Sequence, residues 1–230
     1  MKTLLFLVLA LPLGLSACGG GGAGGAPVFP VVPEAALFVP RVDHRYFPIE
    51  PGRTWVYEGE YLGRPAWEDV RTLPEQRLIL GVPCTGVEER TFVDGILSEQ
   101  TTEWFAQDRA GNVWKFGEEA FDLTSGVPVL AVDSWVAGVS GGTSWRAFAA
   151  DPRAGDRFAG YRPDGIDVLV VTAILAMATV PAGVFGDCLE LTENPDDPED
   201  TDIILYGSRV GRLSERTSTG YMELVSTSAP

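Results

Sequence analysis

Histidine and cysteine are scarce in this chain. Among its 230 residues there are one histidine, His44, and three cysteines. Zinc and copper sites in proteins combine several histidine and cysteine side chains, so the usual sites of these metals are hard to assemble here. We therefore expect no metal of this kind and no cofactor. For His44 the sequence favours a polar capping or surface role over that of a general base.

Positive charge is scarce as well. The chain has 17 lysine and arginine residues against 32 aspartate and glutamate residues, a formal net charge of -15, and only two of the cations are lysines. An acidic domain repels phosphate backbones, which excludes nucleic acid as a natural partner. The excess of acid is typical of a well-solvated surface that resists association, so we expect a monomer.

The chain also lacks an apolar run long enough for a transmembrane helix, which needs about 20 residues. The apolar run TLLFLVLALPLGL begins after Lys2 and contains Pro12. A positive start followed by a short apolar segment is typical of a signal peptide, which we place at residues 1–17. The sequence thus predicts export of a soluble domain.

The residues that end this segment, Leu15-Ser16-Ala17-Cys18, resemble the lipobox of bacterial lipoproteins. The resemblance implies cleavage before Cys18, a diacylglycerol thioether on its sulfur and acylation of the new amine with a chain such as palmitate. Glycine, rather than aspartate, follows the cysteine, as in lipoproteins sent to the outer membrane of double-membraned cells. The partner implied is the membrane, with several acyl chains as a stable anchor. The alternative is an ordinary cleavage site with Cys18 unmodified.

A segment rich in glycine and proline follows. Residues 19–25 are glycine except for Ala23, and four prolines lie between Pro27 and Pro40. Such compositions favour flexible or extended conformations, so we predict a disordered tether over residues 18–43. Its apolar residues are numerous for a solvated linker, and the later half is expected to pack on the domain that follows.

Residues 44–230 carry short alternating apolar and polar runs separated by turn signals, the pattern of an antiparallel β domain. Asp94-Gly95 predicts a tight hairpin. A second hairpin is predicted with its turn at residues 110–112, bringing Trp104 and Trp114 face to face. Three or four strands are expected near the C-terminus. The fold class is therefore mostly β, a single domain of antiparallel strands.

One apolar run in this domain, VLVVTAILAMATV (residues 168–180), has no polar face. Such a run is typical of a fully buried strand or of a helix. Its β-branched residues favour the strand.

Four segments together resemble a group of uncharacterised bacterial exported proteins and lipoproteins. They are YFPIEPGRTWVYEG, WFAQDRAGNVWKFGE, VPAGVFGDCLELTE and GSRVGRLSE, in this order, and they span most of residues 46–216. The resemblance implies a strongly curved antiparallel sheet or open barrel, and it brings no established activity. The run VLVVTAILAMATV is more apolar, and NPDDPEDTD more acidic, than that pattern.

Cys84 and Cys188 remain once Cys18 is assigned to lipid. An even number of cysteines in an oxidising compartment favours a disulfide between them. Two free buried thiols are the alternative. A catalytic role is disfavoured, because a nucleophilic cysteine needs an electropositive setting and Cys188 lies between Asp187 and Glu190.

Two further patterns are weak candidates for chemistry. Gly138 to Gly142 formally match the G-x-S-x-G motif around Ser140, but no histidine follows to complete a catalytic triad. The acidic stretch ENPDDPEDTD offers oxygen ligands for Ca²⁺, although it lacks the spacing of an EF-hand loop. A solvated turn is the alternative for this stretch. The calcium candidates are Asp196, Asp197, Asp200 and Asp202.

The leading functional hypothesis is an envelope lipoprotein whose β domain binds or scaffolds something at the membrane surface without catalysis. One version holds an apolar ligand on the concave face of the sheet. The alternative is a hydrolase of envelope polysaccharide, in which the fold assembles two carboxylates. Tryptophan stacking on sugar is disfavoured, since four of the six tryptophans lie in strand-like or semi-buried contexts. These are Trp55, Trp104, Trp114 and Trp145.

Overall fold

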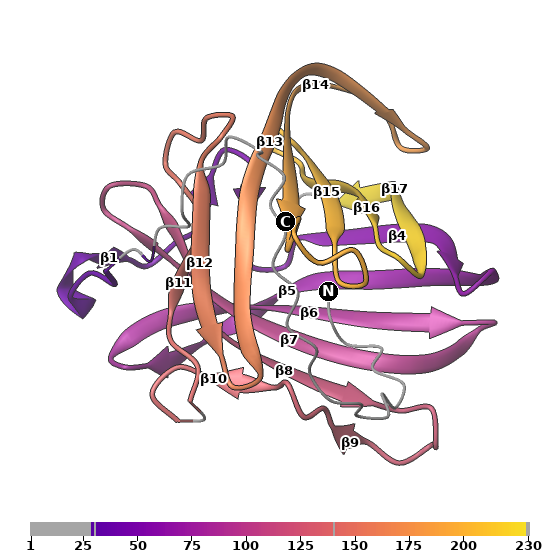
Figure 1. Cartoon of the computed structure of the whole chain (residues 1–230), viewed down its shortest axis with the longest axis horizontal. Helices are drawn as coiled ribbons and strands as arrows, with labels where there is room; N and C mark the ends of the chain where they lie inside the picture. Colours follow the sequence, from indigo (N-terminus) through magenta and orange to yellow (C-terminus); the bar gives the residue numbers. More distant parts are fainter. Residues whose placement is uncertain (1–28, 30, 140, 229–230) are drawn as a thin grey trace, which may run out of the picture.

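A computed structural model describes residues 29, 31–139 and 141–228, and nearly all of its regular structure is β-strand (Figure 1). One short 3-10 helix, η1, spans Ala35–Leu37. The strands are β1 (Phe38–Val39), β2 (Asp43–His44), β3 (Phe47–Pro48), β4 (Thr54–Tyr61), β5 (Arg64–Ile79), β6 (Val82–Val93), β7 (Ile96–Asp108), β8 (Val113–Asp122), β9 (Val129–Leu130), β10 (Trp135–Val136), β11 (Trp145–Phe148), β12 (Arg157–Arg162), β13 (Gly165–Val180), β14 (Gly183–Glu193), β15 (Asp202–Gly207), β16 (Gly211–Arg216) and β17 (Gly220–Ser228). The predicted mostly-β class is confirmed.

All strands except β2 and β3 join one antiparallel sheet. Its order is β10-β8-β7-β6-β5-β4-β17-β16-β15-β14-β13-β12, with β1 added to β7 and with β9 and β11 added to β8. Two meanders, β4 to β8 and β12 to β17, are thus joined where β4 pairs with β17. In Figure 1 the strands of the first meander run nearly at right angles to β12 and β13, so the sheet curves strongly around its interior. The predicted curved, open sheet is confirmed.

The two predicted hairpins are present, but one predicted contact is wrong. Asp94 and Gly95 connect β6 to β7, with φ angles of 50° and 78°, as a type I′ turn requires. In the β7–β8 hairpin Trp104 lies opposite Gly117, whereas Trp114 lies opposite Ala106. The two indoles therefore do not face each other. Residues 110–112 form the turn, and the register shifts after Trp104.

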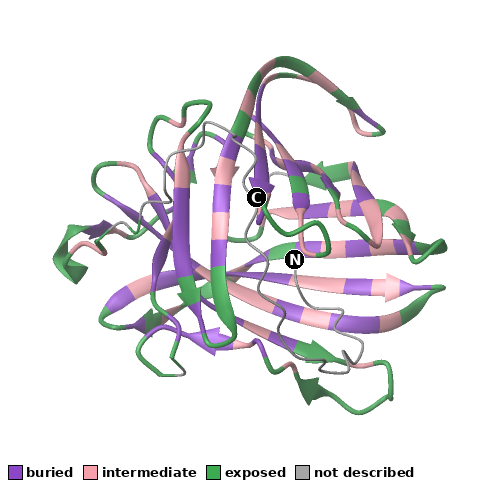
Figure 2. Cartoon of the chain, viewed as in Figure 1, coloured by how far each residue is buried: buried purple, intermediate pink, exposed green. Residues whose placement is uncertain are grey.

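The tryptophans predicted for the core are buried there. Trp55, Trp114 and Trp145 are at most 3% exposed, whereas Trp104 is half-buried. The Trp104 ring packs over Gly86, where a Cβ atom would lie 2.8 Å from the indole. Buried positions follow the strands on both sides of the interior (Figure 2). Aromatic burial of this size supplies much of the hydrophobic stabilisation of the fold.

The apolar run 168–180 forms a strand, β13, but it is not fully buried. The inner part of β13 lies between β12 and β14, whereas residues beyond Val171 pair with β14 alone. Ile174 and Met177 are 45% and 69% exposed. The hairpin then arches back, and the Ala182 N–H donates to the Leu224 carbonyl at 2.9 Å. The middle of the arch is exposed because no neighbouring strand covers it (Figure 1).

The structure holds two free thiols in place of the predicted disulfide. Cys84 lies on β6 and Cys188 on β14, and both are buried. Five strands separate β6 from β14 in the sheet order, and each Sγ donates to a nearby backbone carbonyl, that of Val82 or Phe185. Burial raises the pKa of the Cys84 thiol to about 12 and also raises that of Cys188. Both residues therefore act as small apolar core residues.

The N-terminal predictions fall largely outside the described residues. The signal peptide 1–17, Cys18 and the glycine-rich start of the tether all lie there. The later part of the predicted tether contains η1 and β1, which pairs with β7, and Phe38 and Val42 are buried. Among the described residues, no helix has the length and apolar character needed to cross a bilayer.

Candidate functional site: the acid-lined interior

Two adjoining cavities occupy the interior of the curved sheet. The first has a volume of about 130 Å³ and the second of about 290 Å³, and both are lined by Arg162 and Glu215. Six carboxylates and three cationic side chains line the first cavity together with aromatic rings. Charged groups are rarely buried unless they are paired, so the partners of each carboxylate decide what the interior can bind.

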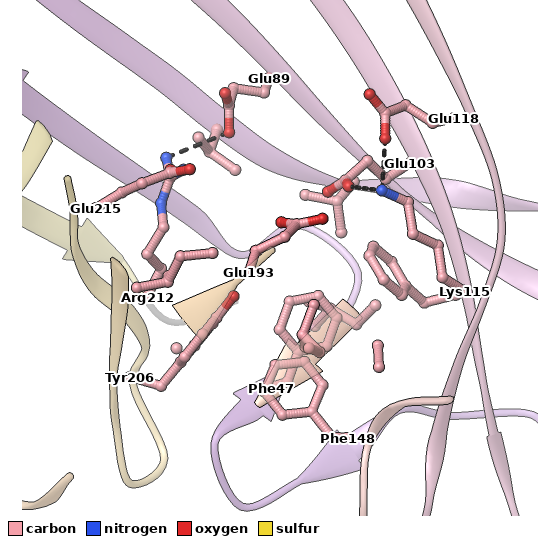
Figure 3. Close-up of a pocket in the computed structure, with 18 of the residues that line it drawn as sticks. Phe47, Glu89, Glu103, Lys115, Glu118, Phe148, Glu193, Tyr206, Arg212 and Glu215 are labelled. Atoms are coloured by element: carbon pink, nitrogen blue, oxygen red, sulfur yellow. Dashed lines mark hydrogen bonds and ion pairs between the residues drawn. The ribbon is translucent and has the colours of Figure 1, made fainter. Parts of the chain in front are cut away.

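The first cluster of charge surrounds Arg212, on β16. Its guanidinium contacts the carboxylates of Glu68, on β5, Glu89, on β6, and Glu215, on its own strand (Figure 3). The guanidinium also lies 4.2 Å from the centre of the Tyr57 ring. Burial and repulsion from Glu68 raise the pKa of Glu89 well above its usual range. One cation thus serves three buried acids, which like-charge repulsion keeps from ionising together.

The second cluster surrounds Lys115, on β8. Its ammonium donates to the carboxylates of Glu103, at 2.6 Å, and Glu118 (Figure 3). Burial opposes the charge of Lys115, but Glu103 and Glu118 raise its pKa well above the usual range. Burial likewise opposes ionisation of Glu118, but Lys115 lowers the pKa of this carboxyl to about 2. Lys115 and Glu118 therefore favour their charged forms, and the hydrogen bonds of the ammonium hold Glu103 and Glu118 in place.

Glu193, at the end of β14, differs from the other acids of the first cavity. Among the described residues, no hydrogen bond or ion pair joins its carboxylate, whereas the other five are paired with Arg162, Lys115 or Arg212. Figure 3 places Glu193 between the two clusters. Burial raises its pKa to about 7. This carboxylate thus makes no ion pair with a described cation, although the charge of Lys115 acts on it.

Aromatic rings lie beside Glu193 in the first cavity and form what we call the aromatic floor: Phe47, Phe105, Phe148 and Tyr206. The ring of Phe47 stacks on that of Phe148, with 5.0 Å between their centres. The rings of Phe105 and Tyr206 meet this pair edge-on. A carboxylate beside the faces of aromatic rings is a favourable environment for an organic cation.

The calcium candidates are dispersed. Asp196 pairs with Arg157, and Asp197 accepts from the Glu199 N–H at 3.2 Å. Asp200 and Asp202 instead line the second cavity, and Asp200 accepts from the Asn194 amide at 3.0 Å. Among the described residues, no three acidic, cysteine or histidine side chains converge on a point where they would hold one metal ion.

The remaining weak candidates do not join the interior site. His44 is buried, and its ring nitrogens bond to the Ala149 carbonyl, at 2.9 Å, and the Tyr46 N–H. It therefore has the capping role of the prediction, but in the core rather than at the surface. Burial lowers its pKa, which favours the neutral ring. Ser140 lies outside the described residues.

Apart from Asp200 and Asp202, the interior acids were not among the site residues expected from the sequence. A signal for them exists in the strand periodicity. Glu68 shares its strand face with the buried Ala66 and Val70, and Glu193 shares its face with Leu189 and Leu191. An acid in phase with buried apolar residues points inward.

Comparisons with known proteins assign neither family nor activity. No protein-family model and no curated protein matches the chain. A solved structure of a candidate lipoprotein from Parabacteroides distasonis ATCC 8503 is similar to it at 11% sequence identity and a TM-score of 0.41. The similarity covers 80% of this chain and 99% of that chain.

Proposed function

We propose that this chain is a lipoprotein of the cell envelope, anchored through Cys18, whose β domain binds a small organic cation in the first cavity without transforming it. The lipobox resemblance and the preceding apolar segment support the anchor. The state of the Glu193 carboxylate carries the binding proposal. It is the one carboxylate of the first cavity that no cation of the described residues pairs, and it lies beside the aromatic floor.

The balance of charge supports a cation over the other ligands considered. Six carboxylates and three cations give the first cavity an acidic character that opposes apolar and anionic ligands. A polysaccharide hydrolase needs two carboxylates free to act on either side of a glycosidic bond. Five of the six carboxylates here are engaged by Arg162, Lys115 or Arg212, which disfavours that alternative.

Calorimetric titration of the purified full-length chain in mild detergent tests the binding proposal. The probes are choline and benzyltrimethylammonium, with 3,3-dimethylbutanol as the uncharged counterpart of choline. We expect the cations alone to bind, and Glu193→Gln to weaken binding by about tenfold or more, since a buried charge pair loses one partner. Glu190→Gln, on the same strand but outside the first cavity, is the matched control. Equal binding by the alcohol, or no effect of Glu193→Gln, would contradict the proposal.

The anchor is tested separately. We expect the wild-type chain to fractionate with membranes and to take up labelled palmitate. Cys18→Ala is expected to lose both properties. Incorporation of palmitate by this variant would contradict the assignment of Cys18.

A further inference from the structure

The second cavity differs from the first in having almost no cationic side chain. Among the described residues, nine carboxylates and a single guanidinium, that of Arg162, line it. At its rim lie the exposed residues Glu199 and Ser218, whose backbone carbonyl and hydroxyl share a hydrogen bond of 3.1 Å. The cavity therefore extends from the surface to the buried strands behind it.

Among the described residues, two buried carboxylates that line this cavity lack a partner for one oxygen each. Glu99 is 2% exposed; its Oε1 accepts from the Thr101 hydroxyl at 2.8 Å, while Oε2 has no hydrogen-bond partner. Asp133 is 6% exposed, and its Oδ1 also has no partner. A buried acceptor without a partner costs about 1–3 kcal/mol, and more when it is charged. Burial raises the pKa of both carboxyls, that of Glu99 to about 8. A bound cation removes this cost.

The spacing of the acids argues against a single metal ion. Calcium takes six to eight oxygen ligands around one point. No three acidic, cysteine or histidine side chains of the described residues converge in that way. The negative charge of the second cavity is spread along its wall instead, from Glu99 and Asp133 to the rim at Glu199. A matching ligand carries its positive charges at intervals along a chain.

The rest of the wall suits the spacer between such charges. Tyr61, Tyr221 and Met222 line the second cavity, and the hydroxyls of Thr91 and Thr219 lie among them. Methylene groups pack favourably against aromatic and thioether side chains, while ammonium groups donate to hydroxyl and carboxylate oxygens.

We infer that the second cavity binds a linear polyamine, whose ammonium groups are held by Glu99, by Asp133 and by the acids toward the rim. This inference rests on the proposed function in treating the interior as a cation-binding space, but it concerns a different cavity and a different ligand. The methylene chain lies along Tyr61 and Tyr221. Binding is reversible and involves no covalent step.

Titration calorimetry on the full-length chain with spermidine, at about 0.15 M ionic strength to suppress weak surface binding, tests this inference. We expect the double variant Glu99→Gln/Asp133→Asn to bind spermidine about tenfold or more weakly. Glu75→Gln, at an exposed position on β5, controls for the loss of charge alone. Thermal unfolding of each variant establishes that it is folded.

Three results separate the possibilities. Spermidine binding that is unchanged in the double variant would overturn the inference. Equal weakening by Glu75→Gln would do so as well. Binding of Ca²⁺ or Mg²⁺ that is tighter than binding of spermidine would also overturn it. Glu193→Gln is expected to reduce binding of benzyltrimethylammonium while leaving spermidine bound. A wild-type chain that binds spermidine but no quaternary cation would count against the proposed function alone. The reverse pattern would count against the polyamine alone.

Discussion

Two regions of this molecule differ from the usual distribution of side chains: one buries charged groups, and the other exposes apolar groups. The interior holds clusters of carboxylates around Arg212 and Lys115, whereas the arch of the β13–β14 hairpin, residues 173–186, contains no charged residue and is largely exposed. The carboxylates of these two clusters are tolerated inside because each is paired with Arg212 or Lys115. The arch tolerates exposure because its backbone hydrogen bonds are made within the hairpin. Burial here follows the curvature of the sheet and not hydropathy alone.

The largest effect is expected from removing the cation of the first cluster. Arg212→Met leaves Glu68, Glu89 and Glu215 buried without their shared partner, which should cost about 3–5 kcal/mol. Arg216→Met is the control. Arg216 pairs with Glu223, and its side chain is 61% exposed, so this pair should contribute less than about 1 kcal/mol to the free energy of unfolding. Urea denaturation measures both. Similar losses in the two variants would show that the interior pairing does not hold this region together.

A smaller but still large contrast is expected within the β13–β14 hairpin itself. Leu189, at its inner end, is fully buried, so Leu189→Ala should cost about 2–5 kcal/mol. Met177, on the arch, is 69% exposed, and Met177→Ala should change stability by no more than about 0.5 kcal/mol. The free energy of unfolding in urea measures the difference. A large loss at Met177 would mean that the arch is covered in solution.

The third contrast concerns Glu99, and its effect depends on pH. Its pKa is raised to about 8 by burial and by the nearby Glu118 and Glu68, from an ordinary value of 4.5. The folded chain therefore holds this proton more tightly than the unfolded chain, so stability falls as pH rises between these values. Glu99→Gln should remove that fall and raise Tm at pH 8 by about 2–4 °C for each kcal/mol recovered. Thermal unfolding at pH 5 and pH 8 measures it.

Glu75→Gln serves as the control for the Glu99 experiment. Glu75 is exposed to solvent on β5. Its substitution should leave the pH dependence of Tm unchanged. A Glu99→Gln variant with the same pH dependence as the wild type would mean that the buried carboxyl titrates normally.

Local patterns in the sequence predicted much of the fold. The Asp94-Gly95 turn, the hairpin around residues 110–112 and the four C-terminal strands are all present, because turn chemistry and a period of two act over a few residues. The Trp104–Trp114 contact was wrong because the turn sets the register of the hairpin, and that register places Trp114 opposite Ala106, two residues away from Trp104. The exposed arch of β13 was missed because hydropathy does not reveal where neighbouring strands end.

The sequence by itself determined the antiparallel β class and its short hairpins, and it supplied Leu15-Ser16-Ala17-Cys18, which resembles a lipobox. These properties depend on residues close together in the chain. Only the tertiary structure decided which acids gather inside, because Glu68, Glu99 and Glu193 come from three strands whose meeting depends on the curvature of the whole sheet. It likewise separated Cys84 from Cys188 by five strands. Contacts between distant segments depend on register and closure, which no short stretch of sequence encodes.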